Sequence, residues 1–172
     1  MLKELKTVTS EEAVSIVKSG NTVFFQGAAM TPNLLINELC ERYKELENVK
    51  IIQIHTDGDA KYMESPYSNS FNLVSCFVGG NVRKGVNTNN GSYIPIFLSE
   101  IHWLFRNHIY PLDVAFIQVS PPDKHGYCSL GLSVDITLPA IQMAKKVVAL
   151  INPKVPRTHG DGIIHMNQMT LM

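Results

Sequence analysis

The sequence predicts an α/β domain in which a mostly parallel, open sheet carries helices on both faces. Short apolar runs rich in β-branched and aromatic residues recur along the chain, and segments with the apolar spacing of helices lie between them. Apolar strands that alternate with helices are typical of parallel sheets that are covered on both sides. With 172 residues, 45% of them hydrophobic, the chain is long enough for a buried core. We therefore expect a single domain over residues 1–172.

The N-terminal part of the chain predicts a helix, a strand and a second helix. Thr9 and Glu12 have the spacing of a capping box, which favours a short helix from this point. The run TVFFQ follows and predicts a buried strand. Thr31 suits the N-cap and Pro32 the first turn of the next helix. This order is a strand-to-helix step of the kind that builds parallel sheets.

The remainder of the chain predicts four more strands and two more helices. The strands are expected at KIIQIH, NLVSCFV, DVAFIQV and VVALI, and the helices at SEIHWLFRN and residues 135–146. Residues 120–135, SPPDKHGYCSLGLSVD, are so rich in Pro, Gly, Ser and Asp that we expect an irregular loop there. A loop of this length is usually either functional or disordered.

Composition and charge exclude several classes of protein. Lys plus Arg and Asp plus Glu number 15 each, so no net charge favours nucleic acid or an anionic membrane as a partner. The apolar runs are shorter than the roughly 20 residues of a membrane-spanning helix, and the N-terminus lacks the core of a signal peptide. We expect a cytoplasmic protein. Its cysteines show no CxxC spacing and are expected to be reduced thiols: Cys40, Cys76 and Cys128.

The predicted sheet locates a candidate site before any motif does. Ligands of open α/β sheets bind outside the carboxyl ends of the strands. Three loops leave such ends and are expected to meet at one crevice: QGAAMTP, SPPDKHGYCSLG and NPKVPRTHGD. Gly27, Ala28 and Ala29 are small enough for a ligand to approach the backbone, although the same residues also permit close packing of a helix on the sheet. The sequence lacks the GxGxxG of a dinucleotide site and the GxxxxGK[ST] of a phosphate loop.

Two other kinds of site receive little support from the sequence. Asp123, His125 and Ser129 include the residue types of a hydrolytic triad, but no GxSxG elbow exposes a serine, so local turn formation is the favoured interpretation. The histidines match no common metal-binding spacing, and we expect neither a metal nor a permanently bound cofactor. Glu100 suits the start of a helix, and Trp103 and Phe105 are expected in the core rather than in a stacking platform.

Several segments together are similar to one known family. SPPDKHGYCSLGLSVD, preceded by GSYIPIFLSEI and followed by NPKVPRTHGDGIIH, resembles the acetyl-CoA hydrolase/transferase family, class I coenzyme A transferases that include acetate and 4-hydroxybutyrate CoA-transferases. The similarity runs in order from about Val8 to His165 and includes SGNTVFFQGAAMTPNLLINEL. The resemblance implies a reaction that moves coenzyme A between short-chain carboxylic acids, with a coenzyme A thioester as substrate. In this family a glutamate carboxylate attacks the thioester and becomes a glutamyl-CoA intermediate.

The chain also departs from the family. Family members have two related α/β halves, and the nucleophilic glutamate and a GIGAIP-like coenzyme A loop lie in the second half, which this sequence lacks. We therefore expect an N-terminal half that was cloned alone, proteolysed or naturally truncated, and that is inactive by itself. No catalytic residue is assigned. The expected partners are acyl-CoA, a short-chain carboxylate and the missing C-terminal half, and the chain is expected to form a homo-oligomer.

In a complete enzyme the Ser120 loop is expected to form one wall of the cleft and to shape the acyl pocket. The resemblance and the three predicted loops nominate these substrate-binding residues: Gln26, Gly27, Ala28, Ala29, Ser120, Pro121, Pro122, Asp123, His125, Gly126 and Ser129. Backbone N–H groups near Gly27 or Gly126 are candidates for contacting the thioester oxygen.

Three alternatives stay open at this stage. The chain is a noncatalytic acyl-CoA-binding or assembly domain, or a separate polypeptide supplies the second half, or the chain is an independent esterase that uses Ser129 and His125. The acyl group, and the choice between transferase and hydrolase, depend on groups contributed by both halves.

Overall fold

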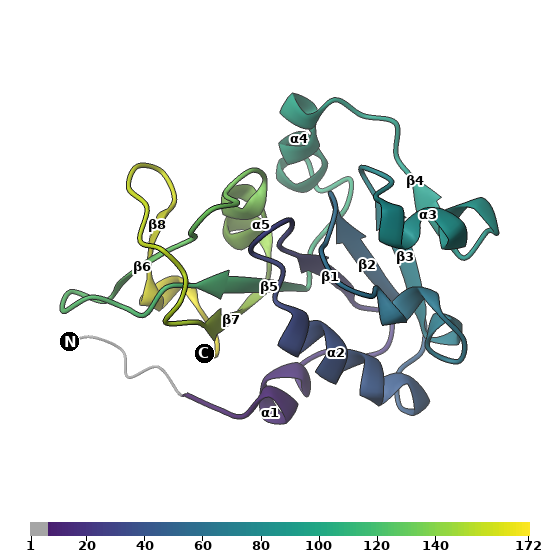
Figure 1. The fold of residues 1–172 in the computed structure, drawn as a ribbon, viewed down its shortest axis with the longest axis horizontal. Coiled ribbons are helices and arrows are strands. Elements are labelled where there is room, and N and C mark those ends of the chain that lie inside the picture. The colour runs from purple at the N-terminus through teal and green to yellow at the C-terminus, as the bar shows by residue number, and fades with distance from the viewer. Residues whose placement is uncertain (1–6) are drawn as a thin grey trace.

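The computed structural model describes residues 7–172, which contain a six-stranded sheet (Figure 1). Its strands follow the order β4-β3-β2-β1-β5-β7, and every neighbouring pair is parallel. The strand bounds are β1 Thr22–Phe25, β2 Val49–Gln53, β3 Phe71–Ser75, β4 Gly91–Tyr93, β5 Val114–Val119 and β7 Lys146–Ile151. The predicted parallel α/β sheet is confirmed.

The sheet is apolar on both faces because side chains alternate along its strands. In β1, Val23 and Phe25 pack into one core and Phe24 packs into the other. In β5, Phe116 lies in the first core and Ala115 in the second. Successive side chains of a strand point to opposite faces, so these uninterrupted apolar runs require cover on both sides.

Helices provide that cover on both faces. Buried side chains of α1 (Ser10–Val14), α2 (Asn33–Glu41) and α3 (Gly80–Asn87) join the core that contains Phe25. Those of α4 (Ile101–Arg106) and α5 (Thr137–Met143) join the core that contains Phe24. Figure 1 shows α1 and α2 on one side of the sheet and α4 on the other. Short 3₁₀ helices complete the chain at Arg42–Lys44, Lys61–Met63, Tyr67–Asn69, Leu98–Glu100 and Met166–Gln168.

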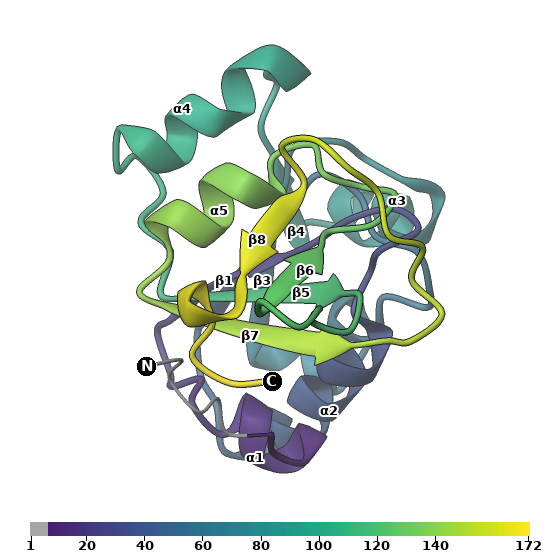
Figure 2. The same cartoon turned by 90° about the vertical axis from the view of Figure 1, so that its left-hand side faces the viewer.

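The expectation that residues 120–135 are wholly irregular is wrong. Strand β6 (Tyr127–Ser129) lies within them and pairs antiparallel with β8 (Ile163–His165). Figure 2 shows this small sheet standing in front of β5 and β7. Cys128 and Ile164 pack into the same core as α4 and α5, which supplies the burial that a three-residue strand requires. The partner strand is far away in the sequence, so local composition did not reveal the pairing.

Helix boundaries follow the predictions at one end and differ at others. The Thr9 hydroxyl accepts a hydrogen bond from Glu12 N, which is one of the two hydrogen bonds of a capping box. Helix α2 begins one position later than expected because Thr31 does not cap it: the Thr31 hydroxyl donates to Ala28 O and accepts from Asp57 N. Helix α5 is shorter than residues 135–146, since Asp135 has a positive φ and β7 already begins at Lys146.

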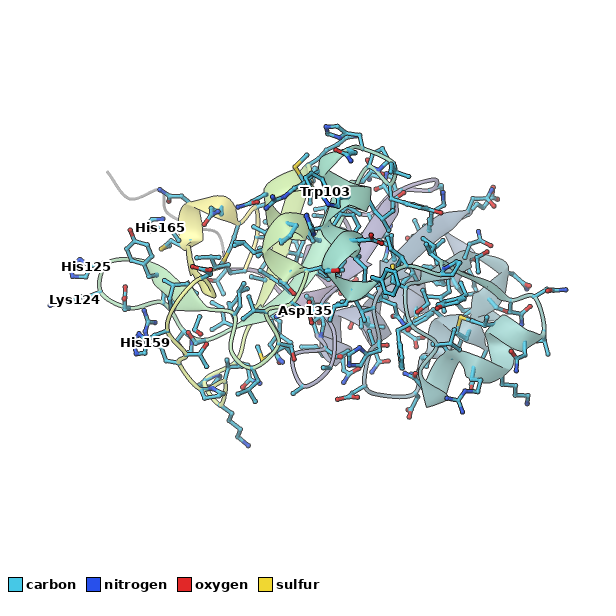
Figure 3. All side chains as sticks on the ribbon, turned by 90° about the horizontal axis from the view of Figure 1, so that it is seen from above. Trp103, Lys124, His125, Asp135, His159 and His165 are labelled. Carbon is cyan, nitrogen blue, oxygen red and sulfur yellow. The ribbon has the colours of Figure 1, made fainter. Side chains whose placement is uncertain are left out.

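Three further predictions concern buried and exposed side chains. Phe105 lies in the core, but the prediction for Trp103 is wrong, since this side chain is 50% exposed on the outer face of α4 (Figure 3). The three cysteines are free thiols, and all are buried. Within residues 7–172, no helix combines the length and the apolar composition needed to cross a membrane.

Candidate functional site

The order of the strands marks one position along the sheet. From β1 the chain adds β2, β3 and β4 on one side, and then returns to add β5 and β7 on the other. The direction of winding therefore reverses between β1 and β5. Open α/β sheets bind ligands at this kind of reversal, outside the carboxyl ends of the strands. The loops that leave these two ends are residues 26–32 and 120–136, which contain the predicted site residues.

Gln26, the residue after β1, ties the two loops together. Its Oε1 accepts a hydrogen bond from Gln118 N at 2.7 Å. Its Nε2 donates to Leu130 O at 3.3 Å and to Ser133 O at 2.9 Å. The side chain is completely buried. Each of its polar atoms is used within the protein, so Gln26 organises the site rather than offering its amide to a ligand.

Ser129 joins the third loop to the other two. Its Oγ accepts hydrogen bonds from Gly131 N at 3.0 Å and Thr158 N at 3.1 Å, and it lies 2.9 Å from Thr158 Oγ1. Thr158 Oγ1 also lies within hydrogen-bonding distance of Gly131 O, at 2.9 Å. A Cβ on Gly131 would contact Met30 and Val155, one residue from each of the other loops. The three loops that the sequence nominated therefore pack against one another.

The small residues after β1 differ in role: Gly27 allows close packing of two loops, and Ala29 is exposed to solvent. A Cβ on Gly27 would overlap the carbonyl oxygen of His55, so glycine permits the close approach of the β1 and β2 loops. Ala28 has a positive φ of 49° and its N–H donates to His55 O. Ala29 is exposed. The packing interpretation holds for Gly27, and Ala29 is the residue of this group that is open to solvent.

The Ser120 loop is held by local polar contacts. Ser120 Oγ accepts from Ser129 N at 2.9 Å, and Ser120 itself is buried. Asp123 accepts hydrogen bonds from the N–H groups of Tyr127 and His125 and pairs with Arg157 at 2.8 Å. The Tyr127 N–H in particular, then that of His125 and the Arg157 charge, hold the pKa of Asp123 below its usual value. Pro121 and Pro122 are exposed.

No hydrolytic triad is assembled from Asp123, His125 and Ser129. The carboxylate of Asp123 faces Arg157 and backbone N–H groups, and the hydroxyl of Ser129 is engaged with Thr158. Figure 3 shows His125 projecting at one end of the molecule, near His159 and Lys124. A nucleophilic serine needs a histidine within hydrogen-bonding distance, so this geometry does not support the esterase alternative.

Two backbone N–H groups near Gly27 and Gly126, the positions proposed to contact the thioester oxygen, already donate hydrogen bonds within the protein. The N–H of Gly126 donates to Asp123 O at 2.9 Å, and that of Ala28 donates to His55 O at 3.1 Å. Neither is free to stabilise a developing oxyanion, which needs an unoccupied donor.

The loops that follow β2 and β3 were not among the three predicted site loops. They line a cavity of about 260 Å³ that includes His55, Asp57, Phe77 and Gly79. The rings of His55 and Phe77 meet edge to face, with centroids 6.0 Å apart. These loops also leave the carboxyl ends of parallel strands, so the rule that selected the other three loops would have selected them. In the described part of the chain, no group of three metal-binding side chains comes together.

The carboxyl edge of the sheet also carries exposed apolar side chains. They follow four different strands and are Phe77 after β3, Tyr93 and Phe97 at and after β4, Leu34 in the helix after β1, and Leu132 after β5. Exposed apolar side chains of this kind are candidates for contact with a partner.

Comparisons with known proteins identify the family of this chain. Residues 3–171 match the family described as the acetyl-CoA hydrolase/transferase N-terminal domain. The chain is 46% identical, over 94% of its length and 34% of the relative, to a succinyl-CoA:acetate/propanoyl-CoA:succinate CoA transferase of Fasciola hepatica. It is 39% identical, over 95% of its length and 38% of the relative, to a 4-hydroxybutyrate coenzyme A transferase of Clostridium kluyveri. The chain thus spans little more than a third of these relatives.

Solved structures give the same result. A 4-hydroxybutyrate CoA-transferase of Porphyromonas gingivalis superposes with a TM-score of 0.79 at 30% identity, over 96% of this chain and 38% of that chain. RipA of Yersinia pestis superposes with a TM-score of 0.87 at 25% identity, over 96% of this chain and 41% of that chain. The chain belongs to the acetyl-CoA hydrolase/transferase family, and it corresponds to the N-terminal domain of that family.

Proposed function

We propose that this domain forms one wall of the active site of a coenzyme A transferase that moves coenzyme A between short-chain carboxylic acids. The observation that carries the proposal is the set of loops braced by Gln26 and Ser129 at the reversal point of the sheet. Family membership supplies the reaction class, since the relatives named above transfer coenzyme A between acids such as succinate, acetate and 4-hydroxybutyrate.

In this proposal the nucleophile comes from the second half of the enzyme. A glutamate of that half attacks the thioester carbon and the coenzyme A thiolate leaves, giving a mixed anhydride. The thiolate then attacks the glutamyl carbonyl, which releases the first acid and leaves a glutamyl-CoA thioester. The acceptor carboxylate collects coenzyme A by the reverse steps. The present domain holds the acyl group and limits the access of water to these intermediates.

The exposed side chains of Phe77 and Phe97 support a second half that covers this part of the surface. Phe77 is 57% exposed and follows β3, and Phe97 is 76% exposed and follows β4, so both lie after the carboxyl ends of strands. Burial of such side chains against a partner contributes roughly 25 cal/mol per Å² of apolar area. The residues 1–172 are accordingly proposed to be a single domain that is inactive alone and becomes an enzyme with its second half.

The test is acetate-dependent coenzyme A transfer from butyryl-CoA, measured for residues 1–172 and for the same chain extended through the second half that its relatives contain. The expected result is turnover by the extended chain alone. Adding hydroxylamine during turnover should trap the activated glutamyl group, whose mass identifies the residue. Turnover by residues 1–172 would overturn the assignment of the nucleophile to the second half. An extended chain that binds acyl-CoA without turnover would instead identify a binding or assembly domain.

A further inference from the structure

Leu132 is an exposed aliphatic residue in the loop that follows β5. Its side chain is 64% exposed, although both neighbouring turns of the chain are firmly attached to the protein. It lies next to Gly131, which packs against the Met30 side chain, and Ala29 beside Met30 is likewise exposed. Leu132 therefore stands where the β1 and β5 loops meet, at the reversal point of the sheet.

The turn that carries Leu132 is braced from two directions. The carbonyl groups on either side of it, Leu130 O and Ser133 O, both accept hydrogen bonds from the buried amide of Gln26. The N–H and C=O of Gly131 bond to Ser129 Oγ and Thr158 Oγ1, respectively. Surface loops are normally the mobile parts of a protein. Here several buried hydrogen bonds fix the backbone beneath an exposed leucine.

We infer that Leu132 is a specificity-determining residue that contacts the acyl chain of the substrate, and that Gln26 is the positioning residue that holds it in place. The inference rests on the proposed function and deepens it. An apolar group on a rigid turn contacts a ligand without losing backbone freedom on binding, which is the physical basis of preorganised sites. A leucine at the cleft stabilises methylene groups of the substrate, whereas acetyl offers a methyl group alone.

The consequence is selectivity for chain length. A methylene group in an apolar pocket changes kcat/KM by about 10-fold to 200-fold. Truncation of Leu132 to alanine removes part of such a contact. The ratio of kcat/KM for butyryl-CoA to that for acetyl-CoA is therefore expected to fall by about 10-fold. The value for acetyl-CoA should change much less, because its acyl chain is too short to profit from the leucine.

The experiment compares Leu132→Ala with wild type in the chain extended through its second half, using acetyl-, propionyl- and butyryl-CoA as donors. Ile109→Ala is the matched control, because Ile109 is 61% exposed but precedes β5 and so lies by the amino ends of the strands. The control should leave the chain-length ratio unchanged. An equal loss for every donor would overturn the inference, because it would assign Leu132 to the contact with the second half or with the coenzyme A arm.

Wild-type transfer from acetyl-CoA tests the proposed function separately. If it occurs while Leu132→Ala keeps the wild-type ratio, the inference fails and the proposed function stands. Gln26→Glu tests the positioning role, since the variant retains an acceptor for Gln118 N and loses the donors for Leu130 O and Ser133 O. We expect Gln26→Glu to lower the same ratio, and the double variant to lower it no further than the larger single effect. Such non-additivity marks residues that act through one another; independent losses would contradict the coupling.

Discussion

Replacement of Gln26 by leucine tests whether one amide organises the site. The change removes the acceptor for Gln118 N and both donors, those for Leu130 O and Ser133 O. The bonds with Gln118 and Leu130 are fully buried, so the groups left unpaired cannot turn to water. Each buried group without a partner costs about 1–3 kcal/mol. Two such groups cost about 2–6 kcal/mol, and burial of leucine returns about 1.5–3 kcal/mol. The expected net loss of unfolding free energy is about 2 kcal/mol.

Urea denaturation of residues 1–172, followed by circular dichroism, measures this loss. Gln142→Leu is the control for the chemistry of the substitution, because Gln142 is exposed on α5. Exposed substitutions of this kind usually change stability by less than about 0.5 kcal/mol. If Gln26→Leu is no more destabilising than the control, the buried amide does not brace the loops and the reasoning fails. An unchanged slope with urea concentration would show that both variants unfold from the same compact state.

Three further predictions concern packing, charge and thiol chemistry. Gly27→Ala places a Cβ against His55 O and should lower the free energy of unfolding by about 1–3 kcal/mol, measured by thermal denaturation. Gly80→Ala is the control, because open space surrounds Gly80, and it should not lower the stability. Equal melting temperatures for the two variants would contradict the packing role of Gly27. Partial desolvation raises the pKa of Asp113, but the hydrogen bonds from Lys145 and Thr22 N and the charge of Lys145 lower it by more, so the pKa lies below its ordinary value of 3.8. The Asp113→Asn variant should therefore be less stable at pH 7, by at most about 1 kcal/mol, and this difference should vanish as the pH falls through the folded pKa; a difference independent of pH would exclude the charge. Burial raises the thiol pKa of Cys40 to about 12 and those of Cys76 and Cys128 to about 11. Alkylation of these thiols at pH 8 should therefore be slow in the native chain and fast in denaturant. Rapid labelling of the native chain would contradict their burial.

The sequence predicted the strongly apolar elements of the fold and missed the weakly patterned ones. The run TVFFQ and the capping box at Thr9 and Glu12 carry their structural reason locally, in composition and spacing. Helix α3 contains glycine at positions 80 and 85, which disfavours a helix, and it buries one residue, Val82, so its signal in the sequence is weak. Strand β4 has three residues, and two of them are exposed. Elements of this kind form because a neighbouring strand or core completes them.

The candidate site divides in the same way. The rule that ligands bind at the carboxyl ends of strands selected the loops at residues 26–32, 120–131 and 152–161, and these loops do pack together. It did not reveal that the polar atoms of Gln26 and Ser129 form hydrogen bonds that hold these loops together, or that Leu132 is exposed. Trp103 was misplaced because an aromatic residue in a helix gives no sign of which face the sheet will cover.

By itself the sequence determined the class of the fold, the family, and the edge of the sheet at which a site should lie. These follow from patterns that repeat along the chain and from motifs that are read in order. The tertiary structure alone decided which strands are neighbours, and so where the winding reverses between β1 and β5. It also decided which polar side chains form hydrogen bonds within the protein and which apolar side chains are exposed to solvent. Both depend on contacts between residues far apart in the chain, such as Gln26 and Ser133, which are 107 positions apart, and no local pattern can specify such partners.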